Sequence, residues 1–535
     1  MVALRRRLGE PLASLAGQSL IAGVFFLPLL ARLHEAILAD DIFIRPGQSD
    51  AYNFLWGYWW VQKAVSLAVS PLHCSWVLPP NGADLRLHTL PLLPAVISYP
   101  LGRVLGTVAA YNLTILGLLT GGALAAQWTF RRALGLAPAA AFVAGALFGF
   151  SPYFVYKAHA QLHLVGAVFW ASALGQIATA YARHDFGWRR GALLALFAWS
   201  TFWSSLTEFT MLAIMGGALA VLYELAPPAG RPSGIERLRL VWPGLLGAIS
   251  LVPVLRGGTD HVSVALYHGL RLRNFLRFPP LSALSPPDVW FLPEFGGMYL
   301  PLALAIPATL GLLLAWRSRR DLLPFAAAAG LAALLTVDAF HLPTDVLRSL
   351  PLGQGFRVFS RFYPFVLFFA AGLAGLALES LWRWPRRPVG ALGAVLLAAA
   401  FVAEYRPARL DPSPVRRLAL PATVQSEIDR SRFLLVVPRR DYRNVHDTWA
   451  VTLDMRTVHL SFVGREIAAE RELRESLFPR VYLEPPALQD PAFLSELRRL
   501  DVGYVLFESD GSPRPPWGRE IAREGETSLW SLTGR

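Results

Sequence analysis

Long apolar stretches separated by short arginine-rich segments fill residues 1–405. A further apolar run at 89–106 is interrupted by three prolines and Gly102, so we expect it to lie at the membrane interface or to re-enter, covered by protein. Eleven other stretches approach the roughly 20 residues that a helix needs to cross a bilayer. They lie at 13–33, 108–129, 137–153, 162–182, 190–206, 207–225, 240–256, 298–316, 322–340, 362–382 and 388–405. The pattern predicts an all-α polytopic membrane bundle of about 11 transmembrane helices.

The arginine clusters predict the orientation of this bundle. If the N-terminus is cytoplasmic, the inner segments are much richer in Lys and Arg than the outer loops, which is the usual bias of membrane proteins. The run at 12–33 is too long for a secretory signal and lacks a cleavage site, so we expect it to stay as the first span. The outward-facing segments would be 34–107, a short turn near 154–161, 257–297, 341–361 and everything after about 406. We place the chain in a bacterial inner membrane.

The tail, residues 406–535, has shorter apolar runs and predicts a small extracytoplasmic α/β domain. Residues 432–438 and 502–507 are typical of buried strands, and 491–500 of an amphipathic helix between them. Residues 528–532 would form a final edge strand. Because the tail holds no nucleophile motif, phosphate loop or metal spacing, we interpret it as a lid or docking module.

Composition agrees with a membrane protein. Of 535 residues, 54% are hydrophobic and 16% charged, whereas soluble domains carry about 25% charged residues. The net charge of +13 does not indicate a nucleic-acid partner, because the arginines sit in short clusters between apolar runs. Cys74 is the only cysteine, which excludes a disulfide framework and a cysteine-based metal site.

One aromatic stretch in the first outer loop carries the main candidate acid, Asp50. Tyr52, Leu55, Trp56 and Trp59 follow it at i, i+3, i+4 and i+7, which places them on one face of a helix. Trp and Tyr gather where a helix meets lipid on one side and water on the other. We expect an interfacial helix that holds Asp50 at the mouth of a cavity. The alternative is that Asp50 is only the N-cap of this helix.

Other polar residues are predicted on the outer face. His159 and His163 share a face if their segment is helical, and either bind a metal that needs a third ligand or form hydrogen bonds as neutral imidazoles. Glu208 lies where two apolar runs abut, where an acid usually faces a polar cavity or a partner. His88 lies farther along the first outer loop.

Arg357 and Arg361 would lie outside, against the usual charge bias. Guanidinium groups bind phosphate in a bidentate manner, so a lipid-linked phosphate is a fitting ligand. A salt bridge to an outer acid or contact with ordinary headgroups are the alternatives.

These motifs resemble the GT-C superfamily of polytopic, polyprenyl-phosphate-sugar-dependent glycosyltransferases, and look most like bacterial YfhO-type and arabinosyl- or mannosyltransferase-like members. The resemblance is carried by Ser49-Asp50 with the Trp56…Trp59-Trp60 helix, by Leu87-His88-Thr89-Leu90-Pro91-Leu92, by Phe148-Gly149-Phe150-Ser151-Pro152-Tyr153 ahead of His159, and by Phe356-Arg357-Val358-Phe359-Ser360-Arg361-Phe362. It covers most of 1–405 in layout.

The resemblance implies an inverting transfer of sugar from a polyprenyl-phosphate donor on the extracytoplasmic face, with Asp50 as general base. As a hypothesis from the residues themselves, Arg357 and Arg361 hold the donor phosphate, and His159, His163, Glu208, His88 and Tyr153 line the pocket. The acceptor, whether glycan, lipid or protein, is not indicated. Members often carry a second acid beside the catalytic one, but here the only D-D pair is Asp40-Asp41 and Gln48 stands where an acid is expected. No cofactor is therefore assigned, and a divalent cation, Mg or Mn, stays open.

Two functions of other classes fit the same pattern. A lipid-linked sugar transporter or flippase also needs outer arginines and a membrane cavity, but would spread polar residues through the bilayer depth. A non-catalytic envelope scaffold would depend on residues 406–535 rather than on Asp50.

Overall fold

The computed structural model describes residues 2–39, 49–80, 82–86, 90–228, 230–249, 298–337, 359–383, 387–407, 410–416, 418–437, 447–458, 489–508 and 518–532. The chain divides into two compact units. Unit 1 contains Met1–Leu33, Asn112–Pro253 and Ala265–Pro412, and unit 2 contains His34–Tyr111, Val254–Val264 and Ser413–Arg535. Helix α6 runs from one unit into the other, because its first turns belong to unit 2.

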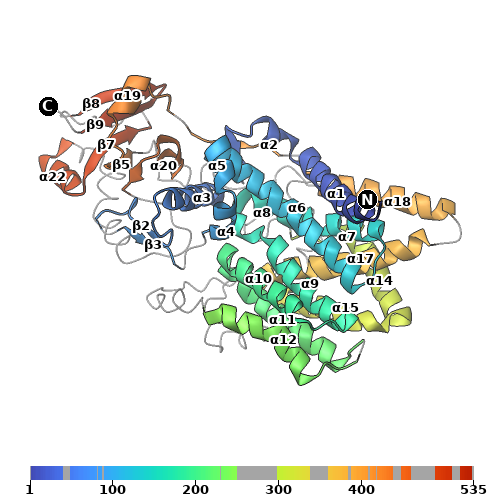
Figure 1. Ribbon diagram of the computed structural model, residues 1–535. Helices are drawn as coiled ribbons and strands as arrows, with labels where there is room; N and C mark the ends of the chain where they lie inside the picture. The colour runs from blue at the N-terminus through green and yellow to red at the C-terminus, as the bar shows by residue number, and fades with distance from the viewer. Residues whose placement is uncertain are drawn as a thin grey trace. The chain divides into compact units, whose positions relative to one another are not determined.

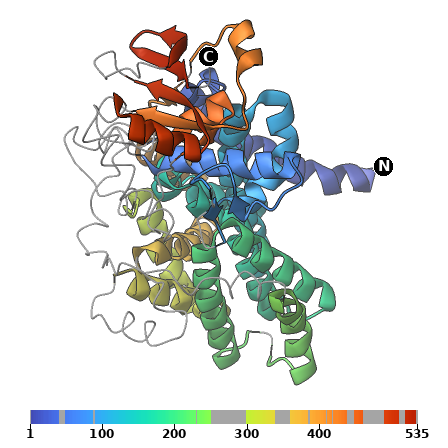
Figure 2. The same ribbon diagram turned by 90° about the vertical axis from the view of Figure 1, so that its left-hand side faces the viewer.

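Unit 1 is helical throughout its described residues (Figure 1). Its helices are α1 (Val2–Phe25), α2 (Leu27–Ala31), most of α6 (Thr107–Ala133), α7 (Pro138–Gly149), α8 (Pro152–Ala160), α9 (Ala167–Arg183), α10 (Trp188–Ser204), α11 (Leu206–Leu225), α12 (Gly234–Ile249), α14 (Leu302–Ser318), α15 (Leu323–Val337), α17 (Tyr363–Trp382) and α18 (Arg387–Tyr405), with the 3-10 turns η1 (Leu162–Leu164), η3 (Arg320–Leu322) and η5 (Phe359–Phe362). Helices α9, α10, α11 and α12 run side by side (Figure 2).

Within the described part of the chain, six helical segments are long and apolar enough to cross a membrane. They are Thr107–Ala133, Pro138–His159, Leu162–Arg183, Leu206–Leu225, Arg320–Val337 and Ser360–Trp382. Each coincides with a predicted span. Helices α1, α10, α12, α14 and α18 occupy the positions of the other five but are shorter or more polar, so the count of eleven stays a prediction.

One segment differs from the sequence prediction, and a second takes a form that the prediction left open. The short turn expected near 154–161 is largely helical, because Ser151-Pro152 starts α8 with proline in its first turn, where the missing N–H costs nothing. The proline-interrupted run forms two short helices, α4 (Leu92–Ile97) and α5 (Tyr99–Leu105), which meet at Ser98.

Helix α17 is the centre of the unit 1 core. Its side chains from Tyr363 to Glu379 are buried on every face, and it packs against α7, α14 and α15. Small residues allow this close packing: a Cβ on Gly311 of α14 would collide with the backbone of Leu373. Glycines at such crossings let membrane helices approach closely, which strengthens van der Waals contact where lipid gives no hydrophobic drive.

Unit 2 contains a five-stranded sheet with the strand order β6-β5-β7-β9-β8. The strands are β5 (Phe433–Val437), β6 (Arg456–Thr457), β7 (Val502–Phe507), β8 (Arg519–Glu524) and β9 (Thr527–Ser531). Strand β5 is parallel to β6 and β7, whereas β9 is antiparallel to β7 and β8. The helices of the tail are α19 (Ala422–Glu427), α20 (Thr448–Leu453) and α22 (Pro491–Arg499).

The predicted strands 432–438 and 502–507 and the helix 491–500 are confirmed. Both central strands are buried on both faces, with Phe493 of α22 packed under one face and Trp449 of α20 under the other. The predicted edge position of 528–532 is wrong, because β9 lies between β7 and β8. The true edge strand, Arg-Glu-Ile-Ala-Arg-Glu, is mostly polar and gave no apolar signal.

The first loop and the tail belong to the same unit because their backbones pair. Strand β1 (Ala36–Ile37) is antiparallel to β4 (Ser413–Pro414), and Val77 bridges Thr457 at the edge of the large sheet. The N–H of Thr457 donates to the carbonyl of Trp76 at 2.9 Å. The loop also contains α3 (Asp50–Ser66) and a hairpin of β2 (His73–Cys74) and β3 (Ala83–Asp84).

Cys74 lies buried in that hairpin, and burial raises the pKa of its thiol well above the usual value. Because only the thiolate reacts readily, we expect the folded protein to resist maleimide labelling at pH 8 and to react fully once it is denatured. Mass spectrometry of labelled protein checks this. Labelling in the native state as fast as that of free cysteine would contradict the burial of the hairpin.

Candidate functional site

Asp50 is the first residue of α3, not its cap. Ser49 is the N-cap, and its Oγ accepts a hydrogen bond from the N–H of Ala51 at 3.2 Å. The alternative that Asp50 is only the cap is therefore wrong. Its half-buried carboxylate lies in the first helical turn, where unpaired N–H groups favour negative charge.

The aromatic helix α3 is buried on every face rather than on one. Tyr52, Trp56 and Trp60 are each at most 2% exposed, and Trp59 is 5% exposed. Inside unit 2, α3 packs against α4 and α20, and the Trp59 ring meets that of Trp76 edge-on. The burial differs from the expected interfacial helix, because the tail supplies a second layer of protein that the local sequence pattern does not reveal.

A cation fixes the far end of α3. The ammonium of Lys63 donates to both carboxylate oxygens of Asp454, at 2.9 and 2.7 Å, and lies 4.7 Å from the centre of the Trp76 ring. Asp454 follows α20 in the tail. The tail therefore holds the helix on which Asp50 is carried, as a docking module would.

In unit 1, α8 carries a buried polar group. Lys157 is 1% exposed and donates to Oε1 of Gln161 at 2.9 Å, and its ammonium lies 5.9 Å from the centre of the Tyr153 ring. His159 hydrogen-bonds through Nδ1 to the carbonyl of Val155 at 2.7 Å, so Nδ1 carries the proton. An ammonium and an imidazole this deep in an apolar bundle are costly, which is typical of functional positions.

His159 and His163 do not share a helical face. Helix α8 ends at Ala160, Gln161 leaves the helical conformation with φ −141° and ψ 73°, and His163 lies in the 3-10 turn η1. In the part of the chain that the structure describes, no three His, Cys, Asp or Glu side chains gather as metal ligands. Both imidazoles are buried.

Glu208 lies in the first turn of α11, at 3% exposure. Its Oε1 accepts from Nε1 of Trp170 at 3.3 Å, and its own N–H donates to Oγ of Ser205, the N-cap. Trp170 packs on Phe365 of α17, with ring centres 4.4 Å apart.

An aromatic chain connects this acid to α8 and to the start of α17. Ring contacts run from Trp170 through Phe148 and Phe154 to Tyr153, and Tyr153 meets Tyr363, two residues after Arg361. Unit 1 therefore brings the neighbourhoods of Tyr153, Glu208 and Arg361 together at the ends of α8, α9, α11 and α17.

Arg357, His88, the Asp40-Asp41 pair and Gln48 lie outside the described residues. Asp50 belongs to unit 2, whereas Tyr153, His159, His163, Glu208 and Arg361 belong to unit 1.

Sequence reasoning missed Lys157 as a site residue. The chain has only two lysines, and this one directly follows Tyr156 in an apolar segment. A lysine inside a run that otherwise reads as membrane-embedded was a sufficient signal.

No known protein family and no curated protein matches the sequence. The fold does match solved structures. It is similar to ArnT from Cupriavidus metallidurans, bound to undecaprenyl phosphate, over 98% of both chains, with a TM-score of 0.51 and 12% identity. It is also similar to the arabinofuranosyltransferase AftD from Mycobacteria, over 97% of this chain, with a TM-score of 0.56 and 15% identity. Both are GT-C membrane glycosyltransferases. The chain has the GT-C fold.

This fold confirms the resemblance drawn from the motifs, and the apolar helices make the chain a membrane protein. The chain spans 40% of the length of AftD but 98% of the length of ArnT. The similarity to ArnT therefore extends over nearly the whole chain.

Proposed function

We propose that the chain is a glycosyltransferase that moves a sugar from a polyprenyl-phosphate donor to an acceptor hydroxyl on the extracytoplasmic face of a bacterial inner membrane. The observation that carries the proposal is the GT-C fold, matched from end to end by a protein whose structure contains undecaprenyl phosphate. The buried polar residues Lys157, His159 and Glu208 support it, because acids and bases at membrane depth usually serve function.

Unit 2 supports the sidedness. Residues 34–111 and the tail form one unit and pair through their backbones, which favours placing both on the same side of the bilayer. With the N-terminus in the cytoplasm and one span before residue 34, both segments are extracytoplasmic. In this proposal the first loop and the tail together form one extracytoplasmic domain. It is larger than the domain that the sequence predicted for residues 406–535 alone.

In the proposed reaction, Asp50 accepts the proton of the acceptor hydroxyl. The oxygen of that hydroxyl forms a bond to the anomeric carbon from the face opposite the phosphate, and the bond from that carbon to the phosphate oxygen breaks. The configuration inverts, and polyprenyl phosphate leaves with both bonding electrons. Proton removal by a positioned carboxylate contributes about 10²–10⁴-fold.

Arg361 and Arg357 bind the departing phosphate in this proposal, and Lys157 adds a buried positive charge to unit 1, the unit that contains Arg361. Cations placed where charge develops stabilise the transition state strongly in a site that excludes water. Tyr153, His159, His163, Glu208 and His88 line the sugar pocket. The steps proposed here are carried by side chains of the chain, and a divalent cation, Mg or Mn, stays open.

Replacing Arg361 with Gln tests the donor site. We expect the KM for a polyprenyl-phosphate sugar to rise about 10- to 100-fold, since a charge-assisted hydrogen bond contributes about 1.5–3 kcal/mol. The assay follows release of polyprenyl phosphate by purified full-length protein in nanodiscs, with a panel of lipid-linked sugars.

The matched control is Arg317→Gln. This variant removes the same charge from an exposed arginine in the last turn of α14. Equal KM values for the two variants would contradict the role of Arg361. Movement of the labelled donor between leaflets without release of polyprenyl phosphate would favour the flippase instead.

A further inference from the structure

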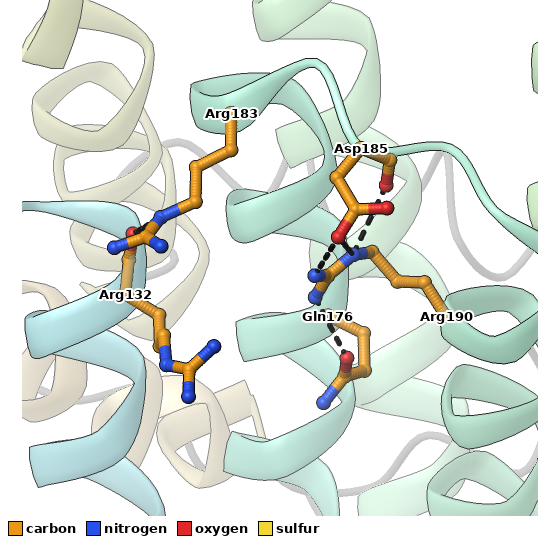
Figure 3. Close-up of polar contacts among 5 residues, drawn as sticks. All are labelled: Arg132, Gln176, Arg183, Asp185 and Arg190. Carbon is orange, nitrogen blue, oxygen red and sulfur yellow. Dashed lines mark hydrogen bonds and ion pairs between the residues drawn. The ribbon is translucent and has the colours of Figure 1, made fainter.

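Two arginines from different helices meet where α6 and α9 end. Nε of Arg183, the last residue of α9, donates to the backbone carbonyl of Arg132, in the last turn of α6, at 2.7 Å (Figure 3). The last carbonyls of a helix lack partners within it, so this bond satisfies one of them. The same bond holds the guanidinium group of Arg183 beside Arg132, whose own side chain carries another guanidinium group.

The acidic side chains at this end of unit 1 form ion pairs with other basic residues. Within the described residues, the ion pairs are Glu10–Arg131, Asp185–Arg190, Glu224–Arg237, Glu236–His184, Asp321–Arg319 and Glu379–Arg383. No acid described by the structure lies within ion-pair distance of Arg132 or Arg183. The nearest acid by charge is Asp185, which already pairs with Arg190 and interacts with Arg183 only beyond ion-pair distance.

The third arginine nearby shows the contrast. Arg190 donates through Nε to the carbonyl of Asp185 at 3.0 Å and through Nη1 to Oε1 of Gln176 at 3.0 Å, and it also pairs with the Asp185 carboxylate (Figure 3). Its hydrogen bond lowers the pKa of Asp185. Arg190 is therefore satisfied by protein, and it stabilises the turn that positions Arg183.

We propose that Arg132 and Arg183 form a phosphate-binding site, occupied by the headgroup of an anionic phospholipid. The bond to the carbonyl uses only Nε of Arg183, so both of its Nη groups can donate to a ligand. Arg132 is exposed, so all the N–H groups of its guanidinium can donate as well. Guanidinium groups bind phosphate in a bidentate manner, and basic sites between membrane helices hold anionic headgroups.

The position fits a headgroup. Both arginines end helices that are long and apolar enough to span the membrane, so they lie at the level of the lipid phosphates. The guanidinium of Arg132 also lies 5.8 Å from the centre of the Trp128 ring, and tryptophan is enriched at this level. This site is separate from the proposed donor site and does not depend on the proposed function.

The test compares Arg132→Gln with Arg189→Gln in the full-length protein. Arg132→Gln removes one guanidinium but keeps the structural bond, because Arg183 bonds to the backbone of residue 132. Arg189 is an exposed arginine on the first turn of α10, with the same charge and no ion pair among the described residues. Native mass spectrometry counts dioleoyl phosphatidylglycerol molecules retained from mixed micelles with phosphatidylcholine.

We expect the wild type and Arg189→Gln to retain one phosphatidylglycerol at concentrations where Arg132→Gln retains none, with at least a tenfold loss of affinity. Inorganic phosphate at 10 mM distinguishes the two sources of phosphate. If it stabilises the wild type but not Arg132→Gln in pure phosphatidylcholine, and no phosphatidylglycerol is retained, the ligand is a free phosphate. Equal retention by Arg132→Gln and Arg189→Gln, with no effect of phosphate, overturns the site.

Discussion

Asp50→Asn is expected to reduce sugar transfer at least 100-fold while the protein folds normally. Asparagine has the shape of aspartate but does not accept a proton, and a positioned general base contributes about 10²–10⁴-fold. The helix start should survive, because its cap is Ser49 and not Asp50. Loss of the charge in the first turn costs α3 about 0.3–2 kcal/mol by the dipole effect.

Asp84→Asn is the matched control for this variant. Asp84 is another acid of the first loop, and it pairs with the exposed Arg86. Surface pairs of this kind contribute about 0–1 kcal/mol, so transfer should stay near the wild-type rate. Turnover by both variants is measured as released polyprenyl phosphate, and native Cys74 protection reports whether unit 2 is folded. Near-normal turnover by folded Asp50→Asn would exclude the base role and favour the scaffold.

The sequence predicted the elements whose side-chain pattern is set locally. Buried strands such as 502–507 appear as continuous apolar runs, and six spans appear as long ones. Strand β8 was missed because an edge strand with one solvated side needs few apolar residues. The pairing of Val77 with Thr457 joins residues 380 positions apart, so no local pattern reveals it.

The sequence also predicted only those parts of the candidate site that have a local signal. The polar residues of α8 and α11 were found because charge or imidazole in an apolar run is a local signal. The end of α8 between His159 and His163 was not predicted. Gln161 leaves the helical conformation there, but no proline or glycine in the sequence marks the change. The burial of α3 depends on α20, a helix contributed by the distant tail.

The start of α17, close to Arg361, depends on an acid that the sequence pattern did not single out. Glu404, near the end of α18, accepts from Tyr299 at 2.8 Å and from the N–H groups of Leu302 and Ala303 at 3.0 and 2.8 Å. Tyr363, the first residue of α17, donates to the carbonyl of Tyr299 at 2.6 Å. One buried carboxylate thus connects α18, the start of α14 and the start of α17.

Glu404→Ala should therefore lower the free energy of unfolding by about 3 kcal/mol, because it leaves one hydroxyl and two N–H groups buried without their acceptor. Glu404→Gln keeps one carbonyl acceptor and should cost about 1 kcal/mol. Asp411→Asn is the control, since Asp411 is 80% exposed and its ion pair among the described residues is with Arg32, at 3.9 Å. Unfolding in mixed micelles of increasing sodium dodecyl sulfate, followed by tryptophan fluorescence, ranks the three variants. If Glu404→Ala and Asp411→Asn unfold at the same sodium dodecyl sulfate content, the carboxylate does not hold the three helices together.

If Glu404→Ala unfolds at a lower sodium dodecyl sulfate content than Asp411→Asn, its KM for the lipid-linked donor should also rise, because Arg361 lies two residues before Tyr363.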